Sequence, residues 1–406
     1  MKYVVILGDG MADWKVDVLG GKTPLQYSNI ENFDYFAKHG VVGMVKTVPT
    51  GMNPGSDTAN LAVFGYDPAV YYSGRSPYEA ASIGVPMLAS DVTFRLNFVT
   101  LSEGDHYGDR VMLDHSSDEI TTGEATVLLN SIREAFATEE IEFHAGISYR
   151  HIMLWHEAPY EFKLVPPHDI IGKNVKEYMP QGPGSEKIQA MMEKSAEILK
   201  NHPVNLDRIK RGLKPANSIW IWGEGKKPLL SNFEEKYGLK GSVISAVDLI
   251  KGIGKCADMK IIEVEGATGN VHTNFDGKAA AALEELKNGA DFVYLHVEAP
   301  DECGHRNEVE NKVKSIELLD KKIAKVLVEE LDKLGEDYKI LVLPDHPTPL
   351  AIRTHTGDPV PFVIYDSTKK AEAVADATYD EDYASSTGVY IEHGYKLMDL
   401  FIKGEI

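Results

Sequence analysis

Both ends of the chain follow one pattern of short apolar runs and amphipathic helices, and this pattern constrains the fold most. KYVVILGDG, residues 2–10, is a β-branched and apolar run that stops at a turn, as expected of a strand buried on both faces. The C-terminal third alternates predicted helices (276–289, 307–335) with predicted strands (291–298, 338–346, 359–365). Such alternation predicts parallel βαβ units. We therefore expect an α/β fold, a mostly parallel sheet sandwiched by helices.

The middle of the chain has a different pattern. Residues 95–165 hold shorter alternating segments separated by polar turns, and a Pro/Gly-rich loop then precedes the predicted helix QAMMEKSAEILKNH. We therefore expect a smaller α+β domain, residues 86–240, inserted into a discontinuous catalytic domain formed by residues 1–85 and 241–406. The inserted domain is expected to bind and cover a substrate.

Composition excludes several classes of partner. The chain has 42 Lys and Arg against 62 Asp and Glu, a formal net charge of −20 over 406 residues. This balance argues against a nucleic-acid or anionic-membrane partner, since both call for a positive surface, but a small anionic substrate needs only a local basic cluster. The two cysteines, Cys256 and Cys303, are far apart, and no apolar run is long enough to span a bilayer. These features indicate a cytoplasmic protein; they leave the oligomeric state open.

The segment NPGSDTAN, residues 53–60, places Ser56 at the start of a predicted helix. Serine is a favoured N-cap, because its side-chain oxygen accepts a hydrogen bond from a free backbone N–H of the first turn. A serine hydroxyl is a poor nucleophile unless a base or a metal lowers its pKa. A metal facing Ser56 would activate it, and the helix N-terminus would stabilise an incoming phosphate. Cap and nucleophile are compatible interpretations.

Metal-capable side chains follow three predicted strands. Singly, an aspartate after a strand is typical of a turn or a helix cap, and a lone histidine is typical of a surface or core position. In open parallel sheets, however, the functional crevice lies at the carboxyl ends of the strands. Together these residues predict two divalent ions bound by oxygen and nitrogen ligands, an arrangement suited to phosphoryl transfer. The residues are Asp9, Asp301, His305, Asp345, His346 and His355.

These positions resemble the metal and nucleophile motifs of the alkaline phosphatase superfamily. Within it, GDGMAD, GGKTPLQ, NPGSDTANLAVFGYDP, SGRSP and EGATGN are similar to the archaeal-type cofactor-independent (2,3-bisphosphoglycerate-independent) phosphoglycerate mutases. The resemblance covers both ends of the chain. It implies an alkaline-phosphatase-like fold and a metal-dependent phosphotransferase that interconverts 2- and 3-phosphoglycerate through a phosphoserine intermediate at Ser56.

The resemblance also implies how the ligands divide between two metal ions, typically manganese, zinc or magnesium. One ion would be held by Asp9, Ser56, Asp345 and His346. The other would be held by Asp301, His305 and His355.

The predicted insertion resembles the family less closely. DHSSDEI, residues 114–120, is acidic and polar where archaeal mutases tend to carry a basic segment. Arg75 in SGRSP and Arg150 in YRH are candidates for binding the oxygens of a small phosphorylated substrate, because arginine offers paired donors. A solvated surface arginine is an equally good interpretation of each.

Three alternatives stay open beside the mutase. The first is an ATP-dependent homoserine kinase on the same scaffold, because bacterial relatives with this kind of sequence have been proposed to be homoserine kinases. The second is a metal-dependent phosphatase, which would not need so large an inserted domain. The third is a binding protein on a decayed phosphatase fold, which is disfavoured because every expected ligand position holds a competent residue.

Overall fold

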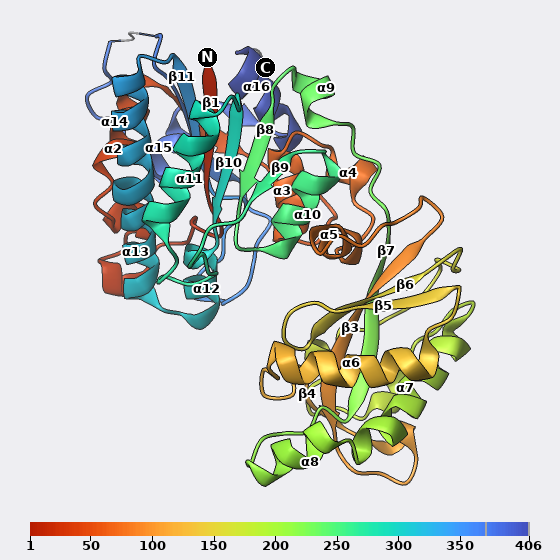
Figure 1. The fold of residues 1–406 in the computed structure, drawn as a ribbon. Helices are drawn as coiled ribbons and strands as arrows, with labels where there is room; N and C mark the ends of the chain where they lie inside the picture. The colour runs from red at the N-terminus through yellow and green to blue at the C-terminus, as the bar shows by residue number, and fades with distance from the viewer. Residues whose placement is uncertain (370–371, 405–406) are drawn as a thin grey trace. The chain divides into compact units, whose positions relative to one another are not determined.

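The computed structural model describes residues 1–369 and 372–404 and divides into two compact units (Figure 1). The larger unit consists of Met1–Tyr72 with Leu230–Ile406, and the smaller unit is Ser73–Leu229. The predicted fold class, a mostly parallel sheet between helices with a smaller inserted α+β domain, is confirmed. In the described residues, no helix has both the length and the apolar character that crossing a membrane requires.

The predicted boundaries of the insertion, 86 and 240, are wrong by more than ten residues at each end. Helix α5 (Ser76–Ser82) belongs to the smaller unit, because Ser76 Oγ donates a hydrogen bond of 3.0 Å to the carbonyl of Thr93. Helix α9 (Phe233–Tyr237) belongs to the larger unit, because the Phe233 ring packs 4.7 Å from that of Phe292. Tertiary packing, which local composition does not report, sets both boundaries.

The larger unit is built on an eight-stranded sheet with the order β13-β2-β12-β11-β1-β10-β8-β9. Strands β11, β1, β10, β8 and β9 are parallel neighbours, whereas β12 runs antiparallel to both β11 and β2. The strands are β1 (Lys2–Gly8), β2 (Val41–Val45), β8 (Gly241–Ile244), β9 (Lys260–Ile262), β10 (Phe292–Val297), β11 (Tyr338–Leu343), β12 (Val360–Asp366) and β13 (Tyr390–Ile391).

Helices cover both faces of this sheet (Figure 1). Alternate residues of β1, such as Val4 and Ile6, join a buried core with α2, α11, α13 and α14, and α3 and α10 lie on the opposite face. The helices of this unit are α1 (Pro24–Tyr27), α2 (Glu31–His39), α3 (Ser56–Val63), α4 (Pro68–Tyr71), α9, α10 (Asp248–Cys256), α11 (Phe275–Lys287), α12 (Ala299–Arg306), α13 (Val309–Leu318), α14 (Lys325–Leu334), α15 (Glu381–Ser386) and α16 (Leu397–Lys403).

Two local expectations differ from the structure. The predicted helix at 307–335 consists of α13 and α14 joined by a π-helical segment, Leu319–Ala324. The strand predicted at 359–365 is present, but a loop rather than a helix connects it to β11. Because no crossover helix intervenes, β12 does not complete a βαβ unit and can run antiparallel.

The smaller unit carries an antiparallel sheet with the order β4-β3-β6-β5, in which β7 also pairs with β3. Its core joins strand residues such as Phe94 and Trp220 to Leu129 of α6 and Met192 of α7. Its elements are α5, β3 (Val92–Leu101), β4 (Met112–Asp114), α6 (Thr122–Phe136), β5 (Ile141–His144), β6 (Arg150–Trp155), α7 (Ser185–Lys200), α8 (Pro203–Lys210) and β7 (Ser218–Lys226).

Candidate metal centre

The structure brings the predicted metal ligands together at the carboxyl ends of three adjacent central strands. Asp9 follows β1, and Asp345 and His346 follow β11. Asp301 and His305 lie one turn apart on α12, which begins directly after β10, rather than in the short loop that the sequence suggested. His355 lies in the loop between β11 and β12. The order β11-β1-β10 therefore explains why residues far apart in the sequence meet here.

The first group of ligands surrounds Ser56. His346 Nε2 lies 3.2 Å from Ser56 Oγ, 3.6 Å from Asp9 Oδ1 and 3.5 Å from Asp345 Oδ2. Ser56 Oγ also donates a 3.5 Å hydrogen bond to Asp9 Oδ2. Ligand atoms bound tetrahedrally about 2.1 Å from one ion lie about 3.4 Å from each other. The spacing of this group matches that distance.

The second group gathers three side chains around Asp301. His305 Nε2 lies 3.2 Å from Asp301 Oδ2 and 2.9 Å from His355 Nε2, and His355 Nε2 lies 3.4 Å from Asp301 Oδ1. Asp301, His346 and His355 also lie close enough to hold an ion together. His346, which the resemblance assigned to the first ion alone, thus stands between the two groups.

The buried carboxylates of this centre indicate that it is suited to bind cations. Asp9, Asp301 and Asp345 are all buried. Burial and the neighbouring carboxylate of Asp345 raise the pKa of Asp9 well above its usual value. Asp9 Oδ1 is buried without a hydrogen-bond partner among the described residues. Buried carboxylates that share a site are costly unless a cation compensates them. These residues therefore fit two divalent ions.

Histidines moderate the charge of the second group. Burial would raise the pKa of Asp301, but hydrogen bonds with His305 and His355 hold it well below its usual value. The same hydrogen bond with Asp301 raises the pKa of His305 to about 9. Burial lowers the pKa of His346, which keeps its imidazole neutral. A neutral imidazole is the form that binds a metal.

Ser56 is the first helical residue of α3, and the N-cap position is Gly55. The expectation that Ser56 caps this helix through its side chain is therefore wrong: its hydroxyl faces Asp9 and His346 rather than the backbone of the first turn. The neighbouring carboxylate of Asp57 accepts the hydrogen bond from the Thr58 N–H instead. The Ser56 hydroxyl is thus free for chemistry at the metal centre.

Several residues that hold the ligands escaped prediction. Thr348 Oγ1 donates a short hydrogen bond to Asp301, and Asn60 Nδ2 donates one of 2.8 Å to Asp345 Oδ2. His296 Nε2 lies 3.0 Å from Asp9 Oδ2. A polar residue within the apolar run DFVYLHVE was a signal for His296, as was Asn60 in the apolar helix TANLAVF. Thr348 carried no comparable signal.

Arg75 and Arg150 lie in the smaller unit, and the structure adds Arg95 to them. Glu79 accepts ion pairs of 2.8 Å from Arg75 and 2.9 Å from Arg95. Burial would raise the pKa of Glu79, but the charges of Arg95, Arg75 and Arg150 lower it. The Arg95 guanidinium also stacks 4.2 Å from the ring centre of Trp222. Three guanidinium groups therefore lie near one buried carboxylate. We call Arg75, Arg95 and Arg150 the arginine cluster.

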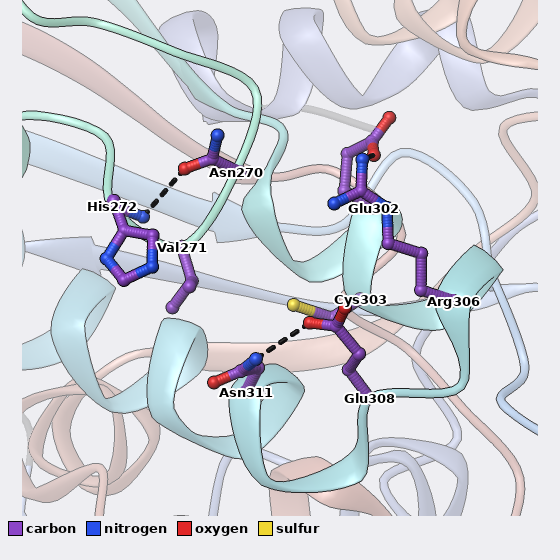
Figure 2. Close-up of a pocket in the computed structure, with 8 residues that line it drawn as sticks. All are labelled: Asn270, Val271, His272, Glu302, Cys303, Arg306, Glu308 and Asn311. Carbon is purple, nitrogen blue, oxygen red and sulfur yellow. Dashed lines mark hydrogen bonds and ion pairs between the residues drawn. The ribbon is translucent and has the colours of Figure 1, made fainter.

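A cavity of about 220 Å³ lies on another side of α12 (Figure 2). Asp301 and His305 face the metal groups, whereas Glu302, Cys303 and Arg306 face this cavity. Burial raises the pKa of the Cys303 thiol to about 11, so this thiol stays protonated. The remaining lining residues are Asn270, Val271, His272, Glu308 and Asn311.

Comparison with known proteins gives consistent matches. The family model described as 2,3-bisphosphoglycerate-independent phosphoglycerate mutase matches residues 37–205. The chain is 48% identical over 402 residues to a probable enzyme of that name from Geobacter sulfurreducens, covering 99% of this chain and 100% of that protein. It is 46% identical over 406 residues to one from Methanosarcina barkeri, with 100% of both chains covered.

Solved structures agree along the whole chain. A protein from Pyrococcus horikoshii matches with a TM-score of 0.82 at 29% identity, covering 99% of this chain and 96% of that one. The cofactor-independent phosphoglycerate mutase from Thermoplasma acidophilum matches with a TM-score of 0.67 at 26% identity, covering 99% of both chains. The similarity therefore extends over both units and confirms the resemblance that the motifs indicated.

Proposed function

Because the chain belongs to the 2,3-bisphosphoglycerate-independent phosphoglycerate mutase family, we propose that it interconverts 2- and 3-phosphoglycerate in the cytoplasm. The observation that carries the proposal is the position of Ser56. Its hydroxyl lies at a helix N-terminus and within 3.5 Å of both Asp9 and His346. A hydroxyl between metal-capable side chains is suited to accept a phosphoryl group.

The proposed metal ligands are the two groups around Ser56 and Asp301. Asp9, Asp345, His346 and Ser56 would hold one ion, and Asp301, His305 and His355 the other, with His346 between them. When bound, two divalent ions neutralise charge on a transferring phosphoryl group and lower the pKa of a nearby hydroxyl. The mixture of carboxylates and imidazoles suits manganese or zinc, and magnesium less well.

Ser56 carries the phosphate between the two half-reactions. Its Oγ forms a bond to phosphorus as the bond from phosphorus to one glycerate oxygen breaks. The proton that Ser56 gives up balances the proton that the released glycerate oxygen gains. In the second half-reaction the other glycerate oxygen takes the phosphoryl group back, and Ser56 recovers its hydroxyl. The N–H groups at the start of α3 stabilise the phosphate while it is held there.

We propose that the arginine cluster of the smaller unit binds oxygens of the phosphorylated substrate. Arginine binds a carboxylate through two parallel hydrogen bonds, and Glu79 holds Arg75 and Arg95 in fixed positions. This assignment makes the inserted unit the substrate-binding domain. It retains Arg75 and Arg150 from the sequence and adds Arg95.

A paired assay tests the function. The Mn²⁺-loaded protein is given 3-phosphoglycerate without bisphosphoglycerate in one reaction and homoserine with ATP in another. We expect 2-phosphoglycerate in the first and no phosphohomoserine in the second. Phosphohomoserine formation without mutase activity would reject the proposal in favour of the kinase, and release of inorganic phosphate alone would favour a phosphatase.

A further inference from the structure

Strand β10 directs two polar side chains toward the face of the sheet that α3 covers. Tyr294 and His296 are two residues apart, so their side chains point to the same face, and both are 0% exposed. The ring of Tyr294 stacks on Phe64, directly after α3, with ring centres 3.9 Å apart. Buried polar groups in a central strand are costly unless they are hydrogen-bonded. The partners of these two residues lead to two different metal ligands.

His296 connects Ser245, which directly follows β8, to Asp9. Ser245 Oγ, which accepts a 3.0 Å hydrogen bond from the N–H of Val247, lies 3.1 Å from His296 Nδ1. His296 Nε2 lies 3.0 Å from Asp9 Oδ2. The form of Asp9 that holds a cation is the ionised carboxylate, which only accepts hydrogen bonds. Toward that form His296 donates through Nε2 and accepts at Nδ1. This arrangement occupies one oxygen of Asp9 and leaves Oδ1 directed toward His346 Nε2.

Tyr294 connects the same strand to Asp345 through Asn60. The Tyr294 hydroxyl donates a 2.6 Å hydrogen bond to Asn60 Oδ1. Asn60 Nδ2 then donates 2.8 Å hydrogen bonds to Asp345 Oδ2 and to the carbonyl of Ser56. The tyrosine therefore fixes which way the Asn60 amide points. Through that amide it positions both a metal ligand and the first turn of the helix that carries Ser56.

We propose that Tyr294 and His296 are positioning residues that set the metal affinity of the group formed by Asp9, Asp345 and His346. This inference rests on the proposed metal centre and extends it to residues that bind no ion themselves. Each holds a carboxylate in the orientation that an ion requires, so the reorientation cost is absent when the ion binds. Partners of this kind change metal affinity by about 10- to 100-fold when they are removed.

The conservative change Tyr294→Phe removes one hydroxyl and keeps the stacked ring. The matched control is Tyr379→Phe, because Tyr379 is also 0% exposed in the larger unit but donates to the backbone carbonyls of Val342 and Pro361. Full-length protein stripped of metal is titrated with Mn²⁺ by calorimetry. We expect about 10-fold weaker binding at one of two sites in Tyr294→Phe and unchanged binding in Tyr379→Phe. Equal Mn²⁺ affinity in wild type and Tyr294→Phe would overturn the proposal.

A second pair of variants tests whether His296 acts through the hydrogen bond that its Nε2 donates to Asp9. Glutamine can present its amide N–H where His296 presents Nε2, whereas leucine cannot. We expect His296→Gln to bind Mn²⁺ within about threefold of wild type, and His296→Leu to bind about 10- to 100-fold more weakly. If both variants weaken binding equally although their melting temperatures match wild type, the hydrogen bond to Asp9 is not the cause and the proposal fails.

The His355→Ala background assigns the affected site, because it removes one ligand group and leaves the group around Asp9. Tyr294→Phe should weaken the single remaining Mn²⁺ site in that background, and an unchanged affinity there would contradict the proposal. Failure of the metal centre itself has a different signature: the wild-type chain would then bind no Mn²⁺ at all.

Discussion

The two units each gather charged side chains, but they balance those charges in opposite ways. In the larger unit, Asp9, Asp301 and Asp345 are buried together, and the pKa of Asp9 is raised by burial and by Asp345. In the smaller unit, the arginine cluster surrounds the single carboxylate of Glu79, whose pKa is lowered. Buried carboxylates predominate in the first region, and guanidinium groups predominate in the second.

This difference indicates what each region binds. Buried carboxylates with an unpartnered oxygen fit cations, and clustered guanidinium groups fit an anion. Substitutions in one region at a time separate the two roles.

Ser56→Ala is expected to have the largest effect, because it removes the proposed nucleophile, which is also one proposed ligand of the first metal ion. Mutase turnover should fall by about 10⁴-fold or more. Since Ser56 is not the helix cap, the free energy of unfolding should change by less than about 0.5 kcal/mol. Coupled-enzyme kinetics and chemical unfolding measure the two quantities. Turnover at the wild-type rate would remove Ser56 from the mechanism.

His355→Ala should come next, with a loss of about 10³-fold in kcat and one Mn²⁺ fewer per chain by elemental analysis. The matched control is His272→Ala, because His272 is exposed and lines the separate cavity beside α12 (Figure 2).

Chelation of the wild-type protein should abolish activity reversibly. Full activity in protein shown to be metal-free would contradict the metal centre.

Arg95→Met tests the positive region. A lost charged hydrogen bond costs about 1.5–3 kcal/mol, so KM for 3-phosphoglycerate should rise about 10- to 100-fold, while the Mn²⁺ stoichiometry stays at the wild-type value. Arg133→Met is the control, because Arg133 lies in the same unit but donates to Asn130 and to the carbonyl of Phe143. A lower kcat with unchanged KM in Arg95→Met would place Arg95 outside substrate binding.

The smallest expected effect concerns how the stability of the smaller unit depends on pH. The residues involved lie away from the arginine cluster. His156 forms 3.0 Å ion pairs with Asp91 and Glu142, and these hydrogen bonds raise its pKa. His144 also faces Glu142, at 2.9 Å. A raised pKa in the folded state means that the stabilisation is fully present below the unfolded value of about 6.5 and is lost as pH rises through the folded pKa.

His156→Gln should therefore destabilise the protein at pH 6 more than at pH 8.5. Three of the four tryptophans, Trp155, Trp220 and Trp222, lie in the smaller unit, so tryptophan fluorescence during urea unfolding reports on it. If the free energy of unfolding changes with pH in the same way in wild type and His156→Gln, the ion pairs of His156 do not cause the pH dependence.

The candidate metal ligands could be predicted from the sequence more fully than the residues that surround them. Strands β1, β10 and β11 are apolar runs, so their ends, and hence Asp9 and Asp345, could be located and assigned to one edge of the sheet. The helical position of Asp301 and His305 and the true cap at Gly55 were missed, because neighbouring turn signals do not separate a loop from the first turn of a helix.

The arginine cluster could be predicted from the sequence only in part. Arg75 and Arg150 stood out because they lie in or beside recognisable motifs. Arg95 lies within β3, and its partner Glu79 lies on α5, so only the packing of this helix against the strand brings them together. Register and packing of this kind have no local sequence signal.

The central claim is that the phosphoryl group passes through Ser56, and the most direct test is to look for it there. Wild-type, Mn²⁺-loaded protein is mixed with 3-phosphoglycerate, quenched in acid during turnover, digested and analysed by mass spectrometry, with Ser56→Ala treated in parallel. We predict a phosphate on Ser56 in the wild-type peptide and none on the Ser56→Ala peptide. Rapid mutase turnover with no phosphate on Ser56 at any quench time would contradict the account.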